Sequence, residues 1–362
     1  MNIPVTRPFL PPYEAYERLL QGIWQRGWLT NHGPLVSELE MSLKETLNID
    51  HLLYVTNGTV ALQIAIRALG LTGEVITTPF SYVATTSSLV WEHCQPVMAD
   101  IDPETLNISP EQIEAAITPR TSGILATHVF GNPCKVQEIQ DIARRHNLKV
   151  IYDAAHAFGV KHKGQSLLSH GDIATCSFHA TKLFHTVEGG SVNTPDPELL
   201  RRMALLRNFG HASQTEFDGI GINGKNSEFH AAMGLSNLPH VPDIIEARRQ
   251  ISERYRNRLE GAPLRFQRIE LETDYNHAYF PVVFEDEATL LTVLTQLNQH
   301  GIFPRRYFYP SLSTLSYVGT QHTPVADNIA LRVACLPLYH NLSLEEVDLI
   351  CRLIKRAIRY GG

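Results

Sequence analysis

The chain has 362 residues, of which 43% are hydrophobic and 19% are charged, with a formal net charge of −6. This length exceeds what one simple core needs, so two domains are expected, and the composition is typical of a soluble globular protein. The acidic balance argues against a nucleic-acid-binding surface, and no apolar run has the length that a membrane span requires.

The cysteines suggest a reducing compartment. There are five, widely spaced and without a CxxC pair, so neither a zinc site nor a disulfide framework is indicated. The N-terminal residues lack the basic start and apolar run of a secretory signal. We therefore expect a cytoplasmic protein that binds no metal.

Two amphipathic helices are predicted first, over residues 12–27 and 35–47. From about residue 51, short apolar runs alternate with helical stretches, which favours βαβ units and a mainly parallel sheet covered on both faces. Strands are predicted over 52–55, 75–77, 96–99, 123–127 and 149–152, and helices over 60–69, 83–91, 110–116 and 136–146. Ligands of such sheets bind beyond the carboxyl ends of the strands.

The pattern changes after about residue 240. A charged helix is predicted over 244–259, a strand over 278–284 and a helix over 288–300, followed by a basic, aromatic stretch over 304–310. Ser343, with Glu345 and Glu346 behind it, is a capping pattern that begins a final helix. We expect the N-terminal helices and a large cofactor-binding domain in residues 1–240, and a smaller α/β domain in residues 241–362.

The first motif with chemical meaning is Thr56-Asn57-Gly58-Thr59, which lies between a predicted strand and a predicted helix. Small residues allow the backbone to approach an anion, and the free N–H groups of a helix N-terminus bind it. The Thr59 hydroxyl adds a further donor. Taken alone, the motif fits an ordinary capped turn equally well.

The second motif is Asp153 at the end of an apolar strand, with His156 shortly after it. A carboxylate at this place can hold a ring nitrogen protonated, as the pyridinium of pyridoxal phosphate (PLP) requires. An N-cap aspartate and a structural histidine would give the same pattern.

The third motif places Ser177 five residues before Lys182, among small and aromatic residues. Burial there would lower the pKa of the lysine and leave its amine free to form a Schiff base. Ser177 can reach a phosphate bound near the same loop. A surface lysine is the simpler alternative, but the three motifs occur in the order of a fold-type I PLP enzyme.

With these motifs in place, the sequence resembles the DegT/DnrJ/EryC1/StrS family of nucleotide-sugar aminotransferases over nearly the whole chain. The opening Gly-Trp-Leu-Thr at 27–30, the phosphate loop at 57–62 and Pro-Phe-Ser-Tyr-Val-Ala-Thr at 79–85 match family motifs. Asp-Ala-Ala-His at 153–156, Ser-Phe at 177–178 with Lys182, and Leu-Pro-Leu at 336–338 match others.

The resemblance implies roles for individual residues. Lys182 would carry PLP, Asp153 would bind the pyridinium, and Tyr82 would stack on the cofactor ring. His156 stands where many relatives have a glutamine that contacts the ring hydroxyl. Asn223 occupies the place of a family asparagine that reaches the phosphate of the neighbouring subunit, which implies a homodimer with shared active sites.

The wall beside the lysine departs from the family pattern, because Phe184, His185 and Val187 replace Leu, Thr and Gly. These changes affect the expected substrate preference rather than transamination, and His185 is a candidate substrate contact. Arg305, Arg306 and Tyr307 form a second candidate, a clamp for a diphosphate and a base. A solvated loop explains the same three residues equally well.

The expected reaction is a ping-pong transamination in which L-glutamate donates the amino group and a nucleotide-linked keto-6-deoxy sugar accepts it. The resemblance favours dTDP-4-keto-6-deoxyglucose and its 4-amino product, and implies a role in deoxyaminosugar biosynthesis for O-antigen or lipopolysaccharide. A C3-acting or UDP/GDP-sugar aminotransferase, a PLP-dependent dehydratase or lyase, and a non-catalytic regulatory relative are the alternatives. One branch of the family replaces the lysine with histidine, and Lys182 argues against that branch.

Overall fold

A seven-stranded sheet forms the centre of the structure, a computed structural model that describes residues 2–319 and 321–360. Its strands are rich in β-branched residues and are buried on both faces, as strands covered by helices on both sides usually are. This confirms the predicted α/β class. In spatial order the strands are β2 (His51–Val55), β10 (Gly190–Thr194), β9 (Ile173–Ser177), β6 (Lys149–Asp153), β5 (Thr121–Thr127), β3 (Glu74–Thr77) and β4 (Gln95–Met98).

One strand of this sheet runs against the others. β10 pairs antiparallel with both β2 and β9, whereas β9, β6, β5, β3 and β4 pair in parallel. The chain passes from β9 to β10 through a loop, without the helix that a parallel crossover needs. The loop therefore lies at the carboxyl edge of the sheet, and it carries Lys182.

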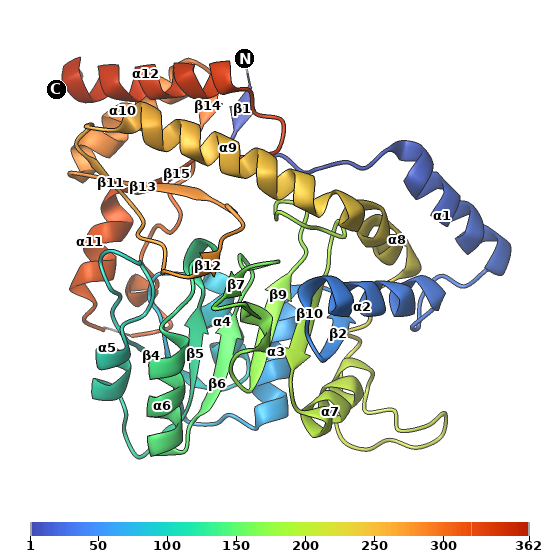
Figure 1. The fold of residues 1–362 in the computed structure, drawn as a ribbon. Coiled ribbons are helices and arrows are strands. Elements are labelled where there is room, and N and C mark those ends of the chain that lie inside the picture. The colour runs from blue at the N-terminus through green and yellow to red at the C-terminus, as the bar shows by residue number, and fades with distance from the viewer. Residues whose placement is uncertain (1, 320, 361–362) are drawn as a thin grey trace.

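Helices cover both faces of the sheet (Figure 1). The helices α2, α6 and α8 pack on one face of the sheet and share a hydrophobic core with it. The helices α3, α4 and α7 pack on the other face in a second hydrophobic core. The helices of this part are α1 (Tyr13–Arg26), α2 (Pro34–Leu47), α3 (Gly58–Leu69), α4 (Val83–Trp91), α5 (Pro110–Ala115), α6 (Val136–His146), α7 (Pro197–Arg207) and α8 (Glu228–Asn237).

The smaller domain follows the long helix α9, which runs across the top of the large domain in Figure 1. It has an antiparallel sheet in the order β11-β13-β15, packed with α9, α10 and α12 in a core of its own. Its elements are α9 (Val241–Leu259), β11 (Leu264–Phe266), β13 (Phe280–Phe284), α10 (Glu287–Gln299), β14 (Ile302–Phe303), α11 (Pro324–Arg332), β15 (Val333–Leu336) and α12 (Leu344–Tyr360).

Two short pairings cross the expected division at residue 240. β1 (Ile3–Pro4) pairs in parallel with β14, so the N-terminal segment joins the smaller domain. β12 (Thr273–Asp274) pairs with β7 (Lys161–His162), which also pairs with β8 (Gln165–Ser166) of the large domain. The two domains are therefore held together by backbone hydrogen bonds as well as by side chains.

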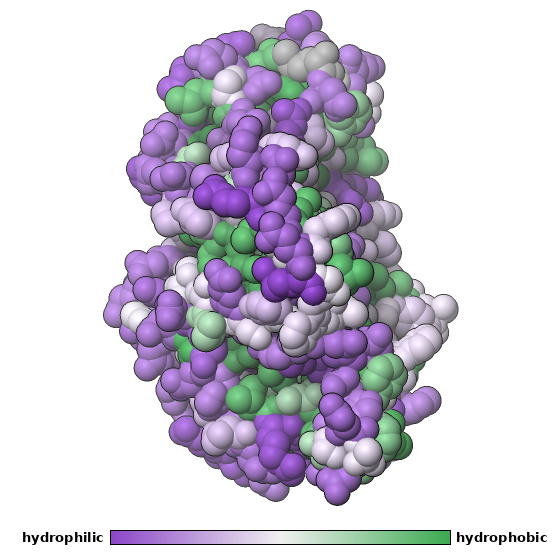
Figure 2. Space-filling view, turned by 90° about the vertical axis from the view of Figure 1, so that its right-hand side faces the viewer, coloured by the Kyte–Doolittle hydropathy of each residue, from purple (hydrophilic) through white to green (hydrophobic). Residues whose placement is uncertain are grey.

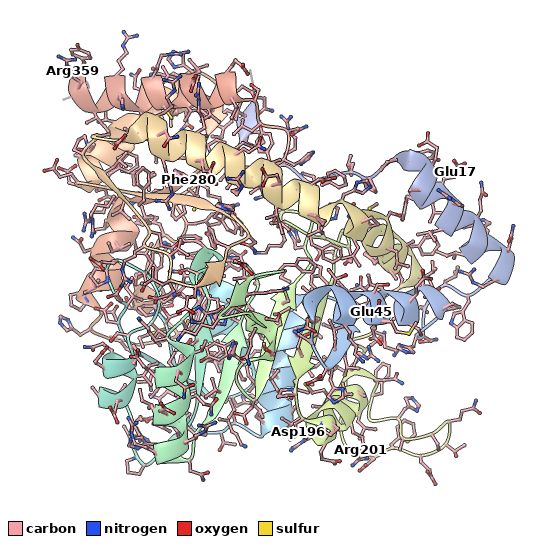
Figure 3. All side chains as sticks on the ribbon, in the orientation of Figure 1. Glu17, Glu45, Asp196, Arg201, Phe280 and Arg359 are labelled. Atoms are coloured by element: carbon pink, nitrogen blue, oxygen red, sulfur yellow. The ribbon has the colours of Figure 1, made fainter. Side chains whose placement is uncertain are left out.

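Side chains follow the same layering (Figure 3). Phe280 on β13 lies beneath α9 and is buried, whereas Glu17 on α1 and Arg201 on α7 lie at the outside of the molecule. Within residues 2–319 and 321–360, no helix combines the length and the apolar character needed to cross a bilayer.

Candidate active site

A cavity of about 450 Å³ opens at the carboxyl edge of the large sheet. The strands β2, β5, β6 and β9 end at this edge, and the smaller domain closes the cavity from the other side. Nine of the residues singled out from the sequence line it: Gly58, Thr59, Tyr82, Asp153, His156, Ser177, Lys182, Arg305 and Tyr307. The fold therefore brings together motifs that are far apart in the sequence.

The N-terminus of α3 forms one wall of the cavity. The side chain of Asn57 caps the helix by accepting a hydrogen bond from the N–H of Val60 at 2.9 Å. In the described part of the chain, no hydrogen bond is donated by the N–H groups of Gly58 or Thr59. These free donors at a helix N-terminus are suited to a phosphate group.

Glycine at position 58 is required by the close approach of Ser177. A Cβ atom at Gly58 would lie 2.9 Å from the Cβ of Ser177, closer than such atoms come in proteins. The backbone of α3 and the Ser177 side chain therefore lie against each other at the end of β9. A larger residue at position 58 would push apart the two groups that face the cavity.

Lys182 lies on the loop between β9 and β10. Backbone hydrogen bonds across the loop, from Phe178 to Gly189 and from Ala180 to Val187, hold it in a narrow hairpin. The Lys182 ammonium lies 5.9 Å from the centre of the Tyr279 ring. Burial lowers the pKa of Lys182, although the nearby Asp153 carboxylate acts in the opposite direction.

Asp153 ends β6 and faces the same cavity. Its Oδ2 accepts a hydrogen bond from the Thr85 hydroxyl at 2.7 Å, and its Oδ1 accepts one from the Ala155 N–H at 3.1 Å. Burial raises the pKa of Asp153, while these two hydrogen bonds act to lower it. The carboxylate is thus fixed in orientation by donors on both oxygens.

His156 is buried in an aromatic stack. Its ring lies nearly parallel to those of Phe130 and Phe308, with centroids 6.0 and 5.8 Å away. Nδ1 accepts a hydrogen bond from the Phe130 N–H at 3.1 Å, which places the ring proton on Nε2. Burial holds the pKa of His156 well below its usual range, so the ring is neutral.

The outer wall is aromatic and basic. Tyr82 precedes α4 and is 54% exposed. Arg305 lies over the ring of Tyr307, 4.7 Å from its centre. Among the described residues, no carboxylate forms an ion pair with Arg305, so its guanidinium is available to an anionic ligand.

Three expected residues are not in the cavity. Arg306 donates hydrogen bonds to Glu287 and to the Leu331 carbonyl, both at 2.7 Å, and lies over the Tyr309 ring. Arg305 is in an extended pairing with Cys335, and successive side chains of an extended segment point to opposite sides. Of the predicted clamp, Arg305 and Tyr307 therefore line the cavity and Arg306 does not.

His185 is also away from the cavity. It is buried, and its Nε2 donates a hydrogen bond to the Phe9 carbonyl at 2.6 Å while its Nδ1 accepts one from the Val187 N–H. It fastens the N-terminal segment to the lysine loop, and the structure does not bring it to the cavity where a substrate contact was expected.

Asn223 is exposed and pairs with Asn208 at the base of a protruding loop, outside the cavity of its own subunit.

Sequence reasoning assigned no role to several side chains of the site, four of which are polar groups at or beside the cavity. Thr127, Ser81 and Tyr279 line the cavity, and Thr85 touches Asp153 behind it. Ser81 and Thr85 lie within the motif at 79–85, four residues apart, a spacing that places both on one side of a helical turn. Tyr279 lies in the predicted strand, where it looked like an ordinary core residue.

The set of donors fits PLP. Free helix N–H groups suit its phosphate, a buried carboxylate suits its ring nitrogen, and a lysine of lowered pKa suits its aldehyde. Within the described residues, no group of three or more His, Cys, Asp or Glu side chains is arranged to hold a metal ion. A separate hollow of about 480 Å³ beside Asp100 and Asp102 contains none of the residues expected from the sequence.

Comparisons with known proteins agree with this chemistry. A model of the DegT/DnrJ/EryC1/StrS aminotransferase family matches residues 14–355. A relative from Shigella dysenteriae, named dTDP-4-amino-4,6-dideoxy-D-glucose transaminase, is 43% identical over 97% of this chain and 98% of its own length. DesI, solved with its TDP-sugar product, has a TM-score of 0.94 at 34% identity, over 99% of this chain and 93% of DesI.

A further solved structure, the Streptococcus pneumoniae protein Spr1654 in its PLP form, has a TM-score of 0.92 at 25% identity, over 99% of this chain and 99% of that one. The family match and the similarity each span almost the whole chain, so the resemblance seen in the sequence is confirmed. The chain therefore belongs to the DegT/DnrJ/EryC1/StrS aminotransferase family, and it is a PLP-dependent aminotransferase.

Proposed function

We propose that this enzyme transfers the amino group of L-glutamate to C4 of dTDP-4-keto-6-deoxyglucose. The products are 2-oxoglutarate and dTDP-4-amino-4,6-dideoxyglucose. The observation that carries the proposal is the meeting of the α3 N-terminus, Asp153 and Lys182 around one cavity. The name of the Shigella dysenteriae relative and the TDP-sugar bound to DesI support the choice of substrate.

Each residue has a role that follows from its position. Gly58, Thr59 and Ser177 would hold the phosphate, and Asp153 would hold the proton of the ring nitrogen. PLP, when bound, supplies an electron sink for the carbon that loses or gains the amino group. Lys182 would bind the cofactor at rest and, once released, would move a proton to and from that carbon, because a buried amine of lowered pKa is an effective base.

Further contacts complete the proposed site. Tyr82 would lie against the cofactor ring, and the neutral His156 would donate its Nε2–H toward the ring hydroxyl. Arg305 and Tyr307 would bind the diphosphate and the base of the sugar nucleotide. The unpaired guanidinium of Arg305 supports this assignment, because the net charge of the chain is negative and a local cation must attract the ligand.

We further propose a homodimer with shared active sites. Large apolar side chains are exposed on α1, on the segment after it and on the 208–223 loop: Trp24, Trp28, Leu29, Phe217 and Ile220. Figure 2 views the molecule from the side where these elements lie in Figure 1 and shows apolar patches between polar residues. These patches are suited to burial against a second copy, and the family resemblance implies that Asn223 would then reach the phosphate in the partner's cavity.

We also propose that the enzyme works in the cytoplasm and supplies an amino-sugar for polysaccharide assembly. Five unbonded, buried cysteines suit the reducing cytoplasm. The amino-sugar product suits the assembly of a surface polysaccharide such as an O-antigen.

The test is direct. Purified protein is incubated with PLP, L-glutamate and dTDP-4-keto-6-deoxyglucose or, separately, its 3-keto isomer, and the product is examined by NMR. We expect nitrogen at C4, formation of 2-oxoglutarate in equal amount, and no product from Lys182→Ala. Amination only at C3, or turnover only with UDP- or GDP-sugars, would contradict the substrate. Product formation without an amino donor would contradict transamination.

A further inference from the structure

A chain of buried hydroxyl groups leads to Asp153. Thr127 Oγ1 donates to Ser81 Oγ at 3.1 Å, Ser81 Oγ lies 2.8 Å from Thr85 Oγ1, and Thr85 donates to Asp153 Oδ2 at 2.7 Å. The three hydroxyl-bearing residues are each at most 2% exposed. They come from β5, from the segment after β3 and from α4, so the chain depends on the tertiary fold.

The protons in this chain have one consistent order while Asp153 is ionised. An ionised carboxylate only accepts, so Thr85 must give its proton to Oδ2. The Ser81 proton must then go to Thr85, and the Thr127 proton to Ser81. If a protonated Asp153 donated to Thr85, the Thr85 proton would have to turn to another acceptor. If it turned to Ser81, the Ser81 proton would turn to Thr127, and the Thr127 proton would need an acceptor of its own.

No such acceptor is recorded for the Thr127 hydroxyl among the residues that the structure describes. Because Thr127 lines the cavity, reversal would require its proton to find an acceptor there instead of within the hydroxyl chain. The other oxygen of Asp153 faces the Ala155 N–H, which can only donate. Each oxygen thus accepts a hydrogen bond from a donor, and this arrangement favours the ionised carboxylate against the effect of burial.

We propose that Thr85 is a positioning residue that keeps Asp153 a weakly basic, fixed carboxylate, with Ser81 and Thr127 orienting the Thr85 hydroxyl. The proposal rests on the proposed function of Asp153 as partner of the PLP ring nitrogen. By drawing charge from Oδ2, Thr85 leaves the shared proton on the ring nitrogen rather than on the carboxylate. The ring then keeps its positive charge during turnover.

The experiment compares three substitutions in the PLP-loaded enzyme. Thr85→Val removes the hydroxyl with little change of shape, Thr85→Ser keeps it, and Ser81→Ala removes only its orienting partner. Thr86→Val is the matched control, because Thr86 is the buried neighbour on α4 whose hydroxyl has no hydrogen-bond partner among the residues that the structure describes. The protein is loaded with PLP labelled with ¹⁵N in the ring, and the ring-nitrogen chemical shift is recorded.

For Thr85→Val we expect the ¹⁵N signal to move toward that of an unprotonated pyridine. We also expect kcat to fall roughly tenfold or more with little change in KM for the keto-sugar, as loss of one hydrogen bond to a charged group implies. Ser81→Ala should shift the signal in the same direction by a smaller amount. Thr85→Ser and Thr86→Val should resemble the wild type.

An unchanged ¹⁵N signal in both Thr85→Val and Ser81→Ala would overturn the proposal, as would an equal shift in Thr86→Val. If Thr85→Val does not fold, the ring-nitrogen chemical shifts of Ser81→Ala and Thr85→Ser test the proposal in its place. The ¹⁵N measurement needs only bound PLP. It therefore tests the positioning role of Thr85 even if the proposed sugar substrate is wrong. A wild-type ring nitrogen that is unprotonated would instead contradict the role of Asp153 itself.

Discussion

At the scale of single residues, burial acts on Lys182 and Asp153 in opposite directions. It lowers the pKa of the lysine and raises that of the acid, because a poorly solvated site disfavours both charges. Their mutual attraction opposes each shift. The site without its cofactor therefore holds two groups whose charges are stabilised mainly by each other and by the donors around Asp153.

Gly58→Ala tests the phosphate site at this scale. The new methyl group would press on Ser177, so the α3 N-terminus and the Ser177 hydroxyl would be forced apart. We expect a folded protein whose affinity for PLP is lower by roughly tenfold, the loss of one good phosphate contact. Affinity is measured by titrating the apoprotein with PLP and following fluorescence quenching.

Gly22→Ala is the control for that titration. Gly22 lies in α1, and a Cβ there would meet only the flexible end of Arg26. This variant should bind PLP as the wild type does. Equal PLP affinity in Gly58→Ala and wild type would show that the phosphate lies elsewhere.

The sequence was a good guide to single residues where a motif joins a strand to a loop. Asp153 and Ser177 end strands, and Gly58 begins a helix, so their convergence followed from the rule for parallel sheets. Arg306 and Thr85 could not be placed in this way. Which of two adjacent arginines faces the cavity depends on a pairing with Cys335, and the Thr85–Asp153 contact depends on how α4 packs.

At the scale of elements, helix α2 receives its N-terminal cap from a distant part of the chain. Gly33 and Pro34 begin the helix and offer no capping side chain. The buried carboxylate of Glu228 on α8 accepts hydrogen bonds from the N–H groups of Leu35 and Val36, at 3.0 and 2.9 Å. A negative charge at a helix N-terminus is also favoured by the helix dipole.

Glu228→Ala should therefore lower the free energy of unfolding by about 2–4 kcal/mol, since two buried N–H groups lose a charged acceptor. Glu228→Gln, which keeps one acceptor oxygen, should lose less. Urea unfolding followed by circular dichroism measures both. Glu38→Gln, on the exposed side of α2, should change the free energy of unfolding little. If it lowered this free energy as much as Glu228→Ala does, the effect would come from charge alone and not from capping.

At this scale several helix positions and the mainly parallel sheet were predicted, but the one antiparallel strand was not. The helices α4 and α6 begin and end where the apolar periodicity predicted. β10 was not predicted, because Gly190–Thr194 is a short run of small and polar residues that is buried only by the sheet around it. Its reversed direction comes from the loop that carries Lys182, a feature that periodicity does not encode.

At the scale of the whole molecule, the proposed dimer has a test by complementation. Lys182→Ala and Asn223→Asp should each be inactive, the second because a carboxylate would repel the partner's phosphate. A mixed dimer has one site with both lesions and one with neither, so mixing the variants should restore part of the activity. Activity is assayed after subunit exchange proven by differently tagged chains, and no recovery would contradict shared sites.

Acid sensitivity is a second property of the whole molecule. Burial lowers the pKa of His128 to about 3 from an ordinary value near 6.5, and its Nδ1 accepts a hydrogen bond from the Cys134 N–H. Between these pH values the unfolded chain binds a proton at this residue and the folded chain does not. Stability must therefore fall as pH falls through this window, by about 1.4 kcal/mol per pH unit for one such group.

His128→Asn keeps an acceptor for Cys134 and removes the titration. We expect this variant to be less stable than the wild type near neutral pH, because stacking on Tyr152 is lost, but to have a flatter pH dependence. Urea unfolding between about pH 7 and about pH 5 provides the comparison. His93→Asn, at an exposed position, is the control, and an unaltered slope in His128→Asn would refute this account.

The pairing of β1 with β14 also constrains how the protein is made. Ile3 is synthesised long before its partner Ile302, so this strand stays unpaired until the residues between them have been made. The large domain can collapse during translation, whereas the smaller domain can close its core only after the segments on both sides of the large domain have been synthesised. A stalled or truncated polypeptide would expose Ile3 and the unfilled core around it, and quality control could recognise that surface.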